Sequence, residues 1–320
     1  MDELILCLRP ACRPYIALAS LVVLTAITSC GGDRPTAPTA PSSAVETHAP
    51  PAPAPPLGSM PAVLVGAGDI ALCGPDLANA EATSRLLDGI DGIVVTPGDN
   101  TQGAGTAQEF RDCYGPTWGR HRARTRPAPG NHDWQTGSGA AYFDYFGEAA
   151  GPSGLGYYSY DAGGWHIVSL NSNVSMSSGS AQAAWLRRDL ESNRTGCTLA
   201  YWHHPLVSSG PNGGSPQVRE AWQILHEFGA EIVMNGHDHM YERFAPQDPS
   251  GRLDLARGIR QFTAGTGGCF LYNVKSLQPN SEVQASVHGV LKLTLREGAY
   301  DWQFIPAAGG FSDAGSGVCH

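Results

Sequence analysis

Short apolar runs alternate with polar loops along most of the chain. Runs of this length, bounded by Gly, Pro, Asn or Asp, are typical of buried β-strands. Five of them matter most for the chemistry: residues 63–67, 93–96, 166–170, 198–202 and 232–234. Three longer segments lie between the strands, and the last of them has apolar residues at the three-to-four-residue spacing of a helix that buries one face. We predict helices at residues 77–87, 180–191 and 216–228.

Strands that alternate with helices predict a largely βαβ organisation, in which the carboxyl ends of neighbouring parallel strands meet at one edge. Polar residues follow several of the predicted strands at that end. They are Asp69, Asp99, the pair His203 and His204, and the pair His237 and His239. Residues 130–133 (Gly-Asn-His-Asp) follow a proline-marked loop. If the strands are adjacent, two carboxylates, one amide and several imidazoles converge on one rim.

This combination of side chains predicts a metal centre. Asp, Asn and His are the ligand set of borderline divalent or trivalent ions, harder than a cysteine site and softer than an all-oxygen calcium loop. Two acids and at least three histidines exceed the needs of one four-coordinate ion. A pair of ions bridged by one carboxylate would use them all, and such a pair can promote displacement at phosphorus.

Five motifs stand in a fixed order: GD at residues 68–69, GDN at 98–100, GNHD at 130–133, HHP at 203–205 and GHDH at 236–239. In these motifs the sequence resembles the calcineurin-like metallophosphoesterases, and within them the purple acid phosphatase-like branch. The resemblance implies an α/β fold, a four-layer α/β/β/α sandwich. It places a dinuclear metal site at the carboxyl ends of the strands, at one end of the two central sheets.

The resemblance also implies a role for each matching ligand. Asp69 and His239 would hold the first metal, and Asp99 would bridge the two ions. The second metal would be held by Asn131, His203 and His237.

Two further histidines are candidates for catalysis. His203 rather than His204 is the expected ligand, because the ligating histidine of the family lies two residues before proline. His204 would then face the substrate phosphate. His132 follows the ligand Asn131, and we expect it to stabilise the transition state or protonate the leaving group. The alternative is that His132 merely braces the site as a hydrogen-bond donor.

Several charged residues close to the motifs are given supporting roles. Asp133 and Asp238 are expected to orient neighbouring imidazoles, and Glu242 and Arg243 to form a structural ion pair. The basic segment at residues 119–126 is interpreted as a solvated face. Its alternative is a positive wall that attracts phosphate substrates.

The sequence departs from the family at the first metal. Purple acid phosphatases have a tyrosine three residues after the bridging aspartate, where this chain has Gln102, and Ala71 replaces a histidine of other branches. A phenolate favours a hard trivalent ion, whereas an amide carbonyl or a water does not. We therefore expect two divalent ions (Zn, Mn or Fe) and no purple colour, unless Tyr114 or Tyr241 restores the phenolate.

Composition narrows the class of partner. Hydrophobic residues make up 42% of the chain and charged residues 15%, which suffices for a large core. A net charge of −9 argues against nucleic acid as a partner. We expect a phosphomonoesterase that cleaves small phosphate esters outside the cytoplasm by attack of a metal-activated water. The alternatives are a phosphodiesterase or nucleotide hydrolase, and a non-catalytic metal-dependent binding protein, which would not need His132.

The beginning of the chain indicates export. Residues 1–29 have the basic and apolar regions of a signal peptide. Residues 27–30 (Ile-Thr-Ser-Cys) resemble a bacterial lipobox, which implies a lipid anchor on Cys30 at the cell surface or in the periplasm. The alternative is a soluble secreted protein. Residues 30–61, rich in Pro, Ala and Thr, predict a disordered tether, which leaves residues 62–320 as one catalytic domain.

Five cysteines remain beyond Cys30, and export permits disulfides. We predict a pair between Cys73 and Cys113, another between Cys269 and Cys319, and a buried thiol at Cys197. Toward the end of the chain, predicted strands at residues 260–264, 290–295 and 300–305 would complete the second sheet. The sequence does not decide whether residues 307–320 pack.

Overall fold

The fold is described from a computed structural model, which places residues 60–193 and 195–320. The predicted signal peptide, the predicted lipid-attachment site at Cys30 and nearly all of the predicted tether lie outside these ranges. Among the placed residues, none of the helices combines the length and the apolar character that a membrane span requires.

The first of two sheets has six strands in the order β13-β12-β11-β1-β2-β3. β1, β2 and β3 are parallel, and β11 pairs antiparallel with β1. The bounds of these strands are β1 (Ala62–Gly66), β2 (Ile93–Pro97), β3 (Thr125–Ala128), β11 (Gly289–Arg296), β12 (Ala299–Pro306) and β13 (Asp313–Val318).

The second sheet has seven strands in the order β10-β8-β9-β7-β6-β5-β4, and β5, β6, β7 and β9 are parallel. Its strands are β4 (Tyr158–Ala162), β5 (Trp165–Ser169), β6 (Cys197–Tyr201), β7 (Ile232–Asn235), β8 (Tyr241–Phe244), β9 (Arg260–Ala264) and β10 (Ser281–Ala285). The five strands predicted ahead of the motifs are all present, with ends shifted by a residue or two.

Two expectations about strands were wrong. β11 and β12 complete the first sheet, not the second, because β11 lies alongside β1 over five residue pairs. The proline-marked segment before Gly130 is not a loop but the edge strand β3, where a proline removes no ladder hydrogen bond that a neighbour needs. Residues 307–320, whose packing the sequence did not decide, contribute the other edge strand, β13.

The helices lie on the two outer faces. They are α1 (Leu77–Asp88), α2 (Ala107–Glu109), α3 (Asn131–Trp134), α4 (Ala140–Phe146), α5 (Ala181–Ser192) and α6 (Arg219–Glu227), with short π or 3₁₀ turns at Phe110–Tyr114, Trp118–Arg124, Gly147–Ala150 and Pro216–Val218. The three predicted helices are confirmed as α1, α5 and α6, the last preceded by a 3₁₀ turn. Ser180 caps the start of α5, where its hydroxyl accepts from the Ala183 N–H.

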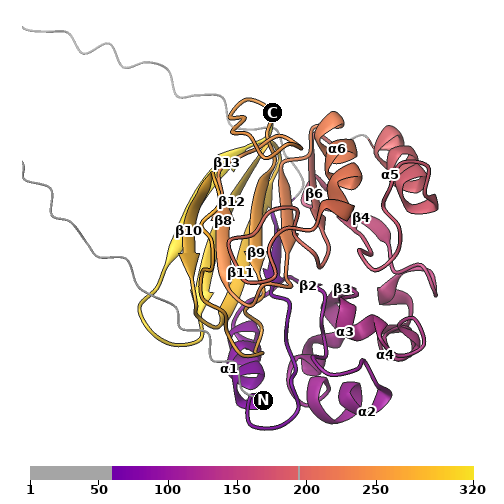
Figure 1. The fold of residues 1–320 in the computed structure, drawn as a ribbon, viewed down its shortest axis with the longest axis vertical. Coiled ribbons are helices and arrows are strands. Elements are labelled where there is room, and N and C mark those ends of the chain that lie inside the picture. The colour runs from indigo at the N-terminus through magenta and orange to yellow at the C-terminus, as the bar shows by residue number, and fades with distance from the viewer. Residues whose placement is uncertain (1–59, 194) are drawn as a thin grey trace, which may run out of the picture. The chain divides into compact units, whose positions relative to one another are not determined.

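Alternating side chains of the strands build the four layers. Leu64 and Ile167 point between the sheets, where residues of both sheets form one apolar cluster. Their neighbours Val65 and Val168 point outward into two separate clusters. One holds α1 against the first sheet, and the other holds α5 and α6 against the second (Figure 1). The predicted α/β/β/α sandwich is therefore confirmed.

The disulfides confirm one predicted pair and correct the other. Cys73 is bonded to Cys113, but Cys319 is bonded to Cys197, and Cys269 is a buried free thiol. The reason lies in strand direction. Cys197 opens β6, whereas Cys269 follows the far end of β9, so these two cysteines lie at opposite ends of one sheet. The chain end reaches only the first of them, where the His320 N–H also donates to Glu231.

Candidate metal centre

The predicted ligands lie in loops at the carboxyl ends of parallel strands in both sheets. Asp69 follows β1, Asp99 follows β2 and Asn131 follows β3, all in the first sheet. The histidines of the HHP and GHDH motifs follow β6 and β7 in the second sheet. Backbone hydrogen bonds join the loops of the two sheets, as from the Gly68 N–H to the Ala264 carbonyl at 2.9 Å. The two sheets thus share one rim.

Three of the ligand positions have a left-handed backbone. Asp69, Asp99 and His237 have φ of 60°, 50° and 70°, and only two other non-glycine residues in the described ranges share that sign. This conformation is costly for residues with a Cβ, and such residues are concentrated at functional sites. Here it turns the chain sharply after the end of a strand.

The motif glycines allow the loops to approach closely. A Cβ on Gly98 would lie 2.5 Å from the His203 ring, and a Cβ on Gly130 would lie 2.0 Å from an Asp99 carboxylate oxygen. No side chain fits either position. The glycines of the GDN and GNHD motifs are therefore required by the packing of ligands around them.

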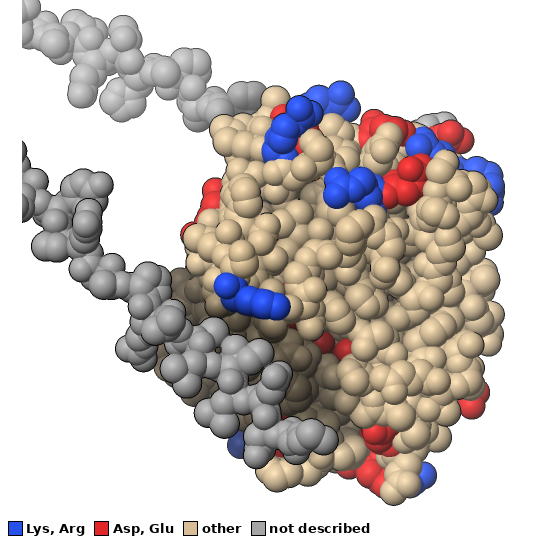
Figure 2. Space-filling view, viewed as in Figure 1, with Lys and Arg blue, Asp and Glu red and all other residues tan. Residues whose placement is uncertain are grey.

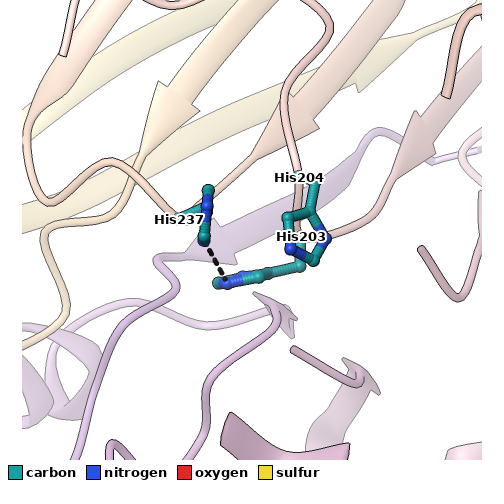
Figure 3. A group of neighbouring side chains, drawn as sticks. All are labelled: His203, His204 and His237. Atoms are coloured by element: carbon teal, nitrogen blue, oxygen red, sulfur yellow. Dashed lines mark hydrogen bonds between the residues drawn. The ribbon is translucent and has the colours of Figure 1, made fainter. Parts of the chain in front are cut away.

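His203 is at the centre of the second predicted ligand group. Its Nδ1 donates to the Pro97 carbonyl at 3.0 Å, which leaves Nε2 facing the site. This atom lies 3.1 Å from Asp99 Oδ2, 3.1 Å from Asn131 Oδ1 and 3.2 Å from His237 Nδ1. Figure 3 shows the His203 and His237 rings approaching each other, with His204 beside them. Four atoms that could ligate a metal ion, one from each of four loops, therefore converge here.

The first predicted ligand group surrounds Asp69. Its Oδ1 lies 3.2 Å from His239 Nε2, and its other carboxylate oxygen accepts from the His237 N–H. The buried Gln102 amide is in contact with both ligands, 3.0 Å from Asp69 Oδ1 and 3.3 Å from His239 Nε2. A half turn of the amide would present its oxygen to the same atoms. Gln102 thus lies where the resemblance predicted it.

Asp99 lies between the two groups. It is 1% exposed, and its Oδ1 accepts from the His132 N–H at 2.8 Å while Oδ2 faces His203. Ligand atoms of Asp69, Asp99 and His203 all lie within 4.8 Å of one another. This position is the one that a bridging carboxylate requires, and the bridging role itself stays a prediction.

The electrostatics of the site favour a cation. Burial opposes charge on His203 and His239, yet Asp99 and Asp69 raise the pKa of His203 to about 9, and Asp69 raises that of His239 to about 11. Burial, together with the charge on His203, lowers the pKa of His237 to about 4 and that of His204 to about 2. The carboxylates therefore stabilise positive charge at two places, one in each ligand group. The carboxylate and imidazole groups at these two places fit a pair of metal ions.

The two candidate catalytic histidines lie on the rim. His132 is held by a 2.5 Å bond between its Nδ1 and the Gly103 carbonyl, and its Nε2 is 4.0 Å from Asp99 Oδ2. His204 Nδ1 bonds the Ser172 hydroxyl at 2.8 Å, a partner that no sequence motif indicated. The His204 ring lies 4.4 Å from that of His237, close enough for a direct role at the second metal as well.

The supporting roles given to Asp133 and Asp238 were wrong. Asp133 accepts from the backbone N–H groups of Asn100, Thr101 and Gly130, and it thereby fastens the β2 loop to the β3 loop. Asp238 accepts from the Ser208 hydroxyl and the Asn212 N–H. Neither carboxylate bonds an imidazole. Backbone N–H groups left open by the sharp turns take these acceptors instead.

Glu242 and Arg243 do not form the expected ion pair. Successive residues of a strand point to opposite faces, and both residues belong to β8. Glu242 accepts from the Ser209 N–H at 2.9 Å, whereas Arg243 pairs with Asp313 at 2.8 Å on the other side.

The basic segment fits a solvated, ion-paired face better than a positive wall. Arg120 pairs with Glu81 and Asp88, and Arg124 donates to carbonyls at the end of α1. These contacts fasten the segment to α1.

Figure 2 shows one face of the molecule, where most Lys and Arg lie toward the upper edge and acidic atoms are visible inside a hollow lower down.

Comparison with known proteins identifies the class. A sequence model of the calcineurin-like phosphoesterases matches residues 63–241, more than half of the chain, and the chain belongs to this family. Among solved structures, a purple acid phosphatase from yellow lupin (Lupinus luteus) seeds superposes with a TM-score of 0.68 at 19% identity, covering 81% of this chain and 54% of that one.

Sequence relatives indicate the purple acid phosphatase branch. Purple acid phosphatase 21 of Arabidopsis thaliana is 30% identical over 252 residues, 68% of this chain and 55% of that protein. Purple acid phosphatase 15 of the same plant is 36% identical over 104 residues, 31% of this chain and 19% of that protein. The chain therefore spans about half or less of the length of these relatives.

Proposed function

We propose that this chain is a metal-dependent phosphoric ester hydrolase, and specifically a phosphomonoesterase for small phosphate esters. The observation that carries the proposal is the convergence on His203 Nε2 of Asp99, Asn131 and His237, beside a second group built on Asp69 and His239. Membership of the phosphoesterase family supports the same reaction.

Asp69, His239 and Asp99 would hold the first metal, and Asn131, His203, His237 and Asp99 the second. When bound, such a pair supplies a nucleophile from water at neutral pH and offsets charge on the phosphoryl oxygens. We propose divalent ions, because Gln102 contributes no negative charge. The two tyrosines considered as substitutes are engaged elsewhere. Tyr241 donates to Asp313, and Tyr114 packs between Phe110 and Phe146 in the core.

His132 would handle the proton of the leaving group. The Gly103 carbonyl can only accept, so the bond between them requires the hydrogen on Nδ1 and leaves Nε2 to carry the exchangeable proton. Nε2 points toward Asp99, and the side chain is 32% exposed, so a substrate can reach it. Transfer of the Nε2 proton to the ester oxygen would let the leaving group depart as a neutral alcohol or phenol.

An assay of the metal-loaded protein on an aryl phosphate and on its bis-aryl diester tests this function. We expect the monoester to be cleaved faster. A diester rate far above the monoester rate would favour the phosphodiesterase alternative. Bound metal with no turnover of either ester would favour a binding protein.

We also propose that the protein is exported and anchored through Cys30. The two disulfides support export, because such bonds persist in oxidising compartments. Expression of the full chain and of Cys30→Ala, followed by detergent-phase partition, tests the anchor. The wild type should enter the detergent phase and the variant should not. Equal partition of both would refute lipidation.

A further inference from the structure

The segment between β9 and β10 carries an aromatic side chain that packing does not explain. Phe270 is 49% exposed and belongs to none of the three apolar clusters. Single exposed apolar residues are common on protein surfaces. What distinguishes Phe270 is how firmly the predicted ligands of the first metal hold it.

Three backbone contacts fix the segment to those ligands. The Cys269 N–H donates to the Asp69 carbonyl at 2.9 Å, and the Tyr272 N–H donates to the His239 carbonyl at 2.8 Å. The Phe270 carbonyl accepts from His239 Nδ1 at 2.8 Å. The backbone on both sides of Phe270 is therefore tied to the metal-binding loops.

The ring of Phe270 is held as well. It meets the His239 ring edge-on at 5.1 Å and the Tyr272 ring edge-on at 5.6 Å. Tyr272 lies flat against His239, with 4.3 Å between centroids and 5° between planes. Two neighbours thus fix one part of the Phe270 ring and leave the rest open to solvent. A ring positioned in advance loses little entropy when it binds a planar ligand.

We propose that Phe270 is a specificity-determining residue, a wall against which the aromatic group of an aryl or arylalkyl phosphate ester packs. The inference rests on the proposed function. A phosphate bound at the first metal, which Asp69 and His239 would hold, would bring its ester group within reach of a ring whose centroid lies 5.1 Å from that of His239. Contact between aromatic rings then favours esters of aromatic alcohols over aliphatic ones by about three- to tenfold in affinity.

Binding of two phosphonates, measured by calorimetry on the metal-loaded protein, tests the wall without turnover. Phenylphosphonate and methylphosphonate share the phosphoryl group and differ in the ring. In Phe270→Ala, the Kd of phenylphosphonate should rise about three- to tenfold, whereas that of methylphosphonate should not change. The His239 bond is made to the backbone carbonyl, so the variant keeps it. Metal analysis verifies that both ions remain.

Matched variants separate the wall from general loosening of the segment. Phe270→Tyr should keep the preference, and Leu277→Ala, which removes a 61% exposed side chain from the same segment, should leave it unchanged. An equal loss for both phosphonates in Phe270→Ala would overturn the proposal, and so would no loss. Wild-type protein that prefers phenylphosphonate but hydrolyses no ester would leave the wall standing and refute the proposed function.

Steady-state kinetics provide a second test of the role of Phe270. The esters 2-phenylethyl phosphate and 2-cyclohexylethyl phosphate have leaving groups of similar size and basicity. Phe270→Ala should raise KM for the first ester about three- to tenfold and leave kcat unchanged. A parallel rise for the cyclohexyl ester would show that the ring provides only apolar area and would overturn the aromatic preference.

Discussion

Two clusters of this molecule place a buried histidine beside aspartates, and they differ in what the ring nitrogens contact. In the first, His166 bonds Asp161 through Nδ1 at 2.7 Å and Asp189 through Nε2 at 2.8 Å. In the second, His203 Nδ1 donates to the Pro97 carbonyl, and Nε2 of the same ring faces an aspartate, an amide and another imidazole.

The difference separates a structural ion network from a metal centre. The nitrogens of His166 are both satisfied by acceptors, so no lone pair is free for a metal ion. Around His203, two imidazole nitrogens lie 3.2 Å apart with carboxylate and amide oxygens beside them. A bound metal ion would replace the protons for which these side chains otherwise compete. Histidine beside aspartate occurs in both places, and the two differ in the direction of the ring nitrogens and in the amide and second imidazole that lie beside His203.

Removing Asp99 should have the largest effect, because both ligand groups meet it. Asp99→Ala should lose at least one metal ion and about a thousandfold or more in kcat/KM. Metal analysis and steady-state rates measure both losses. The matched control is Asp161→Ala in the other cluster, which should keep two ions and a near-normal rate. Near-normal turnover of fully loaded Asp99→Ala would disprove the dinuclear assignment.

His132→Ala should have the next largest effect and should separate chemistry from metal binding. We expect about a hundredfold lower kcat with both metal ions retained, since the side chain carries a proton and holds no ion. Metal content of the purified variant decides between the roles. Loss of one ion would place His132 among the ligands instead.

Gln102→Tyr should sharpen the contrast between the two ligand groups. The iron-loaded variant should gain an intense visible band that the wild type lacks, because the new phenolate lies beside Asp69 and His239. Gln102→Ala should weaken the first metal about tenfold, as expected for loss of a contact to ligands. A tyrosinate band already present in the iron-loaded wild type would contradict the assignment of Gln102.

His166→Gln should have the smallest effect, and only on stability. Burial opposes charge on His166, but Asp189 and Asp161 raise its pKa above the usual value. The free energy that these ion pairs add to the folded state is therefore fully present below the unfolded pKa of about 6.5. It is lost as pH rises through the folded pKa of His166. We expect a loss of about 1–2 kcal/mol near pH 5, shrinking toward pH 9. Denaturant unfolding at both pH values measures it. A loss that does not depend on pH would exclude a charged His166.

The sequence predicted the features that short-range pattern controls. Apolar runs followed by polar residues located strands and the side chains at their carboxyl ends. Longer segments between these runs located α1, α5 and α6, and apolar spacing supported α6. It did not reveal that Asp133 and Asp238 serve backbone N–H groups, because those groups become available only once the turns form. The partner of Cys319 depended on strand direction across the sheet. Phe270 lies in a segment without periodicity, and no pattern linked it to His239.

The disulfides divide the polypeptide into two covalent rings, closed over separations of 40 and 122 residues. The smaller ring, residues 73–113, contains Asp99 and Gln102. The larger, residues 197–319, contains His203, His237 and His239. A chain-entropy treatment assigns each closure about 4–5 kcal/mol through restriction of the unfolded state. Asp69 lies before the smaller ring and Asn131 lies between the two rings, so four separate parts of the chain must be brought together before the ligand set is complete. A thiol reductant should therefore lower metal retention under mild denaturing conditions, although none of the four bonded sulfur atoms is a ligand.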